Sequence, residues 1–179
     1  MGVTIRRAAS GADARFWGLL LAVLSVAIYG WYAREFERHV GLAVISGDGT
    51  LHPRGMLERV AAYGVAGRRA YVAFLSLACL VPVTGSLVLL RLYETLGEPR
   101  YRRVLTLLAV LPALLALLEN TLHALLAMLH PGGGLWLATL AYVVTVAKAL
   151  ACAGAALALA VVASGWVRRR VDADPHETI

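Results

Sequence analysis

The chain has 179 residues, of which 60% are hydrophobic, and its mean hydropathy is +0.72. A water-soluble domain of this length needs more polar surface than this composition provides, so a soluble globular fold is excluded. The formal net charge of +6 comes from arginines that flank the apolar runs without interleaved aromatic residues, so no nucleic-acid partner is expected.

Four apolar runs are long enough to be interpreted as membrane-spanning helices. Residues 1–15 form a basic leader before the first run, and residues 168–179 form a polar tail after the last. We therefore expect an all-α integral membrane protein over residues 16–167, a four-transmembrane-helix bundle in up-down-up-down order. The predicted spans lie at about residues 16–32, 71–92, 104–130 and 135–167.

A single sizeable loop is predicted over residues 33–69, between the first two spans. Within it, Pro53 favours the first turn of a helix. The apolar residues that follow predict a short helix from Pro53 to about Ala66, which would cap the bundle or lie on the membrane surface.

Prolines mark two further features. Pro82 falls near the middle of the second span, where it frees the carbonyl of Ala78 and predicts a kink. Pro131 opens a chargeless Pro-Gly-Gly-Gly turn, and so short a connection makes the third and fourth spans antiparallel neighbours.

The distribution of arginines predicts the orientation. With the N-terminus inside, ten arginines face the inner side: three in the leader, four in the second connection and three in the tail. The loop at residues 33–69 would place six outside. Because cytoplasmic loops carry an excess of basic residues, we expect an N-in, C-in multi-pass protein of the cell (cytoplasmic) membrane.

The third and fourth runs each contain one charged residue near the middle. Glu119 lies deep in the third run, and Lys148, the single lysine of the chain, lies in the fourth. A charged group at the bilayer centre costs roughly 2.5–3.5 kcal/mol on insertion scales. The two residues are therefore expected to face inward and to pair across the tight turn.

Other polar residues surround this pair. His123 follows Glu119 by one helical turn and shares its face, whereas Asn120 points toward another neighbour. Tyr142 and Thr145 extend the polar side of the fourth span around Lys148. The predicted ligand-binding or buried polar centre comprises Glu119, Asn120, His123, Tyr142, Thr145 and Lys148.

Three interpretations of this centre stay open. It could bind a lipid-like or small-molecule ligand in a transporter-like or accessory protein. It could be a packing salt bridge in a structural subunit of a larger membrane complex. It could catalyse in a lipid-modifying enzyme, with Glu119 or His123 as general base and Lys148 stabilising an anion, although no second acid or nucleophile joins them. Expected partners are membrane lipids, a lipid-like ligand, and a second copy or another subunit.

No catalytic residue, metal or cofactor is assigned. Haem bound between helices needs histidines from facing helices, and here His123 and His130 share one span. Glu119 and His123 alone provide too few ligands for a metal ion. The two cysteines, Cys79 and Cys152, lie inside apolar runs and are expected to pack as small hydrophobic side chains.

Several of these residues together resemble an uncharacterised group of prokaryotic four-helix membrane proteins. The similarity covers about residues 67–150: Gly67-Arg68-Arg69-Ala70-Tyr71 before the second span, Pro82, Glu119-Asn120 and Lys148. That group carries an acid four residues before the helix-two proline and a D-x-x-E-N motif in helix three. This chain has Ala78 and Ala116 at those acidic positions. The resemblance implies no activity, but it links the Glu-Asn and Lys positions.

Overall fold

The computed structural model describes residues 2–45 and 52–173, with side chains described for residues 16, 18–45 and 52–169. Over these residues the fold is helical and contains no strand. The helices are α1 (Gly2–Val40), α2 (Pro53–Ala62), α3 (Gly64–Ala78), α4 (Leu80–Leu96), the 3-10 helix η1 (Pro99–Tyr101), α5 (Arg102–Met128) and α6 (Gly134–Ala173).

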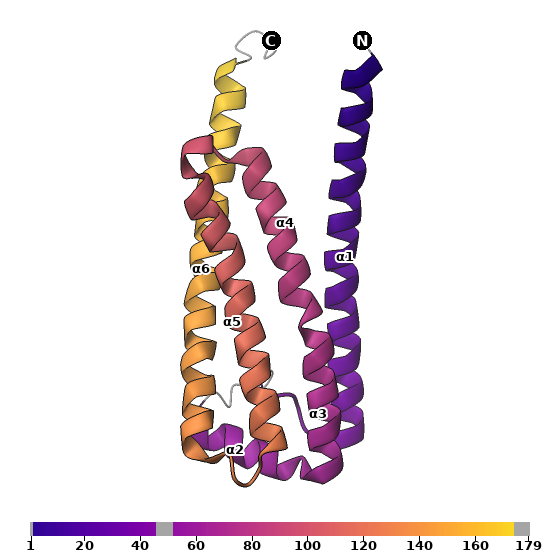
Figure 1. Cartoon of the computed structure of the whole chain (residues 1–179), viewed down its shortest axis with the longest axis vertical. Helices are drawn as coiled ribbons and strands as arrows, with labels where there is room; N and C mark the ends of the chain where they lie inside the picture. The colour runs from indigo at the N-terminus through magenta and orange to yellow at the C-terminus, as the bar shows by residue number, and fades with distance from the viewer. Residues whose placement is uncertain (1, 46–51, 174–179) are drawn as a thin grey trace.

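Four segments are long and apolar enough to cross a membrane: Gly18–Val40, Gly64–Leu96, Pro99–Met128 and Gly134–Arg169. They run in alternating directions, so the described start of α1 and the described end of α6 lie at the same end of the bundle (Figure 1). We call this the terminal end, and the opposite end, where α2 lies across the bundle, the α2 end. The predicted all-helical fold, with four helical segments long and apolar enough to cross a membrane, is thus confirmed in the described part of the chain.

Helix α1 is much longer than the predicted first span, because charged residues interrupt the apolar run without ending the helix. Arg38 Nη1 lies 2.6 Å from Glu35 Oε1, a spacing at which opposite charges meet on one helical face. The helix ends where Gly41 takes a φ of +73° and donates its N–H to Glu37 O. The predicted loop at residues 33–69 is therefore largely helical, since it contains the end of α1, all of α2 and the start of α3.

The short helix predicted to begin at Pro53 is present as α2. Pro53 occupies its first turn, and Nδ1 of His52 accepts a hydrogen bond of 2.8 Å from the N–H of Gly55. This side-chain cap satisfies one of the backbone donors that a helix start leaves unpaired. Helix α2 ends at Ala62 rather than Ala66, because Gly64 takes a φ of +64° and turns the chain into α3.

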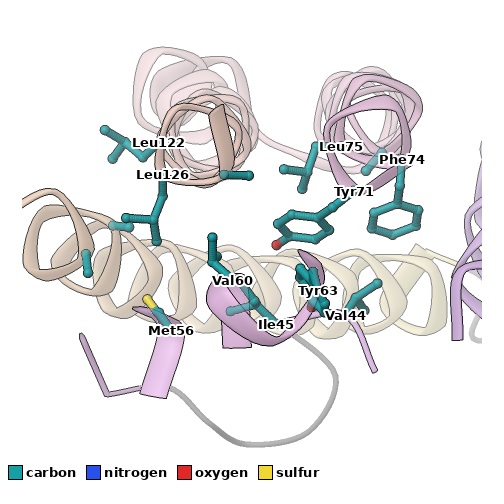
Figure 2. Close-up of a cluster of buried hydrophobic side chains, with 14 of the residues drawn as sticks. Val44, Ile45, Met56, Val60, Tyr63, Tyr71, Phe74, Leu75, Leu122 and Leu126 are labelled. Carbon is teal, nitrogen blue, oxygen red and sulfur yellow. The ribbon is translucent and has the colours of Figure 1, made fainter. Parts of the chain in front are cut away.

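A buried hydrophobic core occupies the α2 end. Figure 2 shows Val60 of α2 between Leu126 of α5 and Tyr71 of α3, with Met56 and Ile45 nearby. Ile45, Met56 and Val60 are fully buried. Helix α2 thus covers the end of the bundle and holds α3 and α5 in position beside the polar residues described below.

The second span is broken at Cys79, which separates α3 from α4. Pro82 lies three positions further on; since proline has no N–H, the carbonyl of Ala78 receives no helical hydrogen bond from it. The Thr84 hydroxyl donates to Leu80 O at 2.8 Å, a local bond that supports the helix after the break. The interruption between α3 and α4 thus lies next to Pro82, where the sequence predicts a kink.

Candidate functional site

The buried faces of α5 and α6 explain why their polar residues meet. On α5 the buried residues recur at helical spacing, and Glu119 is one of them, one turn before His123. On α6, Ala141, Val144 and Thr145 are buried, and Lys148 is the next residue on that stripe. The two helices pack side by side along the bundle (Figure 1), which brings the two stripes together.

Glu119 and Lys148 form the predicted pair. The Lys148 ammonium contacts Glu119 Oε2, and Glu119 is only 3% exposed. A buried carboxylate without a partner is strongly unfavourable, and a neighbouring ammonium offsets that cost. The pair therefore has no net charge when both groups are ionised.

Thr145 completes the environment of the carboxylate. Its hydroxyl donates to Glu119 Oε1 at 2.6 Å and also lies 3.0 Å from Ala141 O. Each carboxylate oxygen of Glu119 therefore has a partner on α6. The predicted grouping of Glu119, Thr145 and Lys148 is present in the structure.

His123 lies one turn nearer the α2 end and is 2% exposed. Its Nδ1 lies 3.3 Å from the hydroxyl of Tyr71 on α3, and its Nε2 has no hydrogen-bond partner in the described part of the chain. Tyr71 is itself buried among the rings of Phe36, Tyr63 and Phe74. His123 thus connects the polar centre to the aromatic part of the core.

Asn120 points toward a different neighbour, as its position on α5 predicts. Its Nδ2 donates to Cys79 Sγ at 3.6 Å, at the break between α3 and α4. Cys79 also contacts Leu75 O at 3.3 Å. This thiol therefore serves as a contact between α5 and the break, in addition to its packing.

A cavity of ≈ 430 Å³ opens beside the ion pair. Its polar lining includes Glu119, Asn120 and Lys148, and most of the other lining residues are apolar or small. The Lys148 side chain is 28% exposed and lines this space. The remaining lining residues are Tyr29, Ala78, Val81, Pro82, Gly85, Ser86, Leu89, Ala109, Pro112, Ala113, Ala116 and Cys152.

The composition of the wall explains why the cavity exists. Pro82 and Pro112 both line it, and Ala78 and Ala116 stand where larger side chains would fill the space.

One predicted site residue lies apart, and one contributing residue was not predicted. Tyr142 is 37% exposed on α6 and does not line the cavity. Tyr71 contacts His123, yet the sequence presented it only as part of the Gly-Arg-x-x-Tyr similarity. Within the described residues, no group of three or more His, Cys, Asp or Glu side chains could hold a metal ion.

The comparisons with known proteins leave the site to be interpreted from its own chemistry. No family model matches the chain, and neither a curated protein nor a solved structure matches it. The resemblance to the prokaryotic four-helix group stays a prediction that these comparisons do not support.

Proposed function

We propose that this chain is a multi-pass protein of the cytoplasmic membrane, oriented N-in and C-in, that binds a lipid-like or small-molecule ligand in the central cavity. The arginine distribution supports the orientation, since ten arginines belong to the terminal end and six to the α2 end. The four long apolar segments support the membrane location.

The exposure of Lys148 to the cavity is the observation that carries the ligand proposal. An ammonium group has three N–H donors, and the protein contact of Lys148 is with Glu119 Oε2. Lys148 and Asn120 both line a cavity of ≈ 430 Å³, so the remaining donors are within reach of a ligand there. A ligand oxygen bound there would accept a hydrogen bond from Lys148 without displacing Glu119.

The charge balance favours a neutral polar group on the ligand. Because Glu119 and Lys148 neutralise one another, an anionic ligand would bring an uncompensated charge into the membrane interior. A carbonyl, ester or quinone-like oxygen would accept the hydrogen bond at lower cost. The apolar walls match a hydrophobic body, and cavities of roughly 300–1,000 Å³ are typical of small-molecule sites.

The position of α1 offers a route from the lipid phase. Helix α1 packs against α3 and α4, whereas no Cα atom in the described part of α1 lies within 8 Å of α5 or α6. Tyr29 of α1 nevertheless lines the same cavity as Lys148 of α6. Side chains rather than packed backbones therefore separate the cavity from the lipid between these helices, and the tail of a ligand could extend through that side.

The experiment compares two alanine-to-leucine variants of the full chain. Ala116→Leu fills part of the cavity and leaves the ion pair intact, whereas Ala149→Leu adds the same volume on an exposed part of α6. Each protein is purified from membranes in mild detergent, and bound small molecules are identified by native mass spectrometry. We expect a co-purifying amphipathic molecule in the unmodified protein and in Ala149→Leu, and its loss in Ala116→Leu. Equal ligand content in both variants, or none in any of them, contradicts the proposal.

The structural-subunit alternative also has an observation in its favour. Both oxygens of Glu119 already have partners on α6. A salt bridge that only holds two helices in register needs no further ligand. In that case the purified protein would carry a second chain or a further copy of itself and no small molecule. The same native mass spectra distinguish these outcomes.

A further inference from the structure

A second cavity, of ≈ 410 Å³, lies at the α2 end between the start of α3 and the end of α5. Three of its lining side chains are basic: Arg68, Arg69 and His130. The other four are apolar: Val65, Val72, Ala127 and Met128. It is separate from the central cavity, with which it shares no lining residue.

The basic groups of this cavity lack acidic partners. Within the described residues, no carboxylate lies within 4.0 Å of Arg68, Arg69 or His130, and no acid lines the cavity. Other arginines of the bundle do pair with acids: Arg38 with Glu35 at 2.6 Å, Arg91 with Glu94 at 2.9 Å and Arg169 with Glu98 at 2.5 Å. The guanidinium groups of Arg68 and Arg69 are thus available to an external anion.

The cavity lies near one end of two candidate spans, where the headgroups of a bilayer would be expected. Arg68 and Arg69 lie in the first turns of α3, and His130 follows the end of α5, so the three lie near the same end of two candidate spans. Val65 is 61% exposed and Met128 is 67% exposed, so the apolar wall faces outward rather than into the core.

We propose that this cavity binds a phospholipid with an anionic headgroup. The phosphate accepts hydrogen bonds from the Arg68 and Arg69 guanidinium groups, whose planar donors suit phosphate oxygens. One acyl chain lies along Val65, Val72 and Met128. The apolar wall favours a lipid over free phosphate, which would leave that wall exposed. The inference is independent of the ligand proposed for the central cavity.

The test compares two double variants that remove the same net charge. Arg68→Gln with Arg69→Gln removes the proposed contacts, whereas Arg102→Gln with Arg103→Gln removes an adjacent pair at the terminal end. Each full-length protein is titrated in detergent with phosphatidylglycerol or phosphatidylcholine, and bound lipids are counted by native mass spectrometry. Because a basic residue near an anionic lipid contributes about 1 kcal/mol, we expect roughly 10- to 30-fold weaker phosphatidylglycerol binding in the first variant. The second should change little, and phosphatidylcholine binding should be unaffected.

A further variant keeps both arginines. Met128→Glu places a carboxylate on the cavity wall, and its charge should weaken phosphatidylglycerol binding. Inorganic phosphate is added as a competitor to distinguish the two sources of the anion. Displacement of the lipid by millimolar phosphate, equal losses in both arginine variants, or no preference for phosphatidylglycerol in the unmodified protein overturns the proposal.

Discussion

Lys148 of α6 contacts Oε2 of Glu119 on α5, and this ion pair joins the two helices that are connected by the turn after His130. The short turn keeps α5 and α6 antiparallel, while the pair fixes how far one is displaced along the other. Removing Lys148 leaves the buried Glu119 carboxylate without compensation, and removing Glu119 leaves the partly buried Lys148 ammonium unpaired. Because a single substitution leaves one charge unpaired, the pair can be tested by mutation.

Glu119→Gln and Lys148→Met should each lower the free energy of unfolding, by about 3–5 kcal/mol where a buried charge is left unpaired. The double variant should lose less than the sum of the two, because neither charge then remains alone. Denaturant unfolding of the purified protein in detergent, followed by circular dichroism, measures all three. The exposed pair Arg91–Glu94 is the control, and Glu94→Gln should cost at most about 1 kcal/mol. Additive losses at Glu119 and Lys148 would contradict the contact.

Thr145→Val should destabilise the protein by about 1–3 kcal/mol, because a buried carboxylate oxygen of Glu119 loses its donor while the side-chain volume is kept. Thr139 on the same helix is exposed, and its hydroxyl donates to Leu135 O at 2.8 Å. Thr139→Val therefore removes a comparable local bond without touching the polar centre. Thermal unfolding in detergent should show a lower Tm for Thr145→Val than for Thr139→Val. Similar Tm values would show that the Thr145 hydroxyl does not support Glu119.

Tyr71→Phe should destabilise the protein because it leaves both ring nitrogens of the buried His123 without a side-chain partner. The expected loss is about 1 kcal/mol, the usual value for one neutral hydrogen bond. In a His123→Leu background the same change should cost much less, since the hydroxyl has already lost its hydrogen-bond partner. Tyr101→Phe, at an exposed position, is the control. Chemical unfolding of the four variants measures the coupling, and equal costs in both backgrounds would remove this contact from the site.

The parts of the fold predicted from the sequence are those that depend on local information. Hydropathy indicates the four spans, because length and apolar composition decide whether a helix can cross a bilayer. The Glu119–Lys148 pair could be predicted because a short turn between two helices restricts which residues lie at equal depth. Thr145 follows from its position one turn before Lys148.

The remaining features depend on how helices rotate about their axes and on neighbours distant in the sequence. Tyr142 is close to Lys148 along the chain but lies on an exposed side of α6. Tyr71 lies far from His123 in sequence, and the contact forms because α2 and the aromatic core hold α3 against α5. The cavity depends on small residues from several helices meeting, which no single segment indicates. The length of α1 depends on charged residues that end an apolar run but still favour a helix.

Gly64 and Gly30 should respond with opposite signs to the same substitution. Gly64 takes a φ of +64° between α2 and α3, and a Cβ there would meet nothing within 4 Å, so the cost of Gly64→Ala is conformational. An L-residue in this region costs roughly 1–2 kcal/mol. Gly30 lies inside α1 with equally open space around its Cβ, so Gly30→Ala should stabilise the helix by about 0.5–1 kcal/mol.

The position of α2 depends on this turn. If Gly64→Ala strains the junction, α2 should separate more readily from the core, and amide hydrogen exchange should increase in α2 and at the start of α3. Gly30→Ala should leave exchange in α2 unchanged. Exchange that is equal in the two variants would show that packing of Met56 and Val60, rather than the Gly64 turn, holds α2 over the end of the bundle.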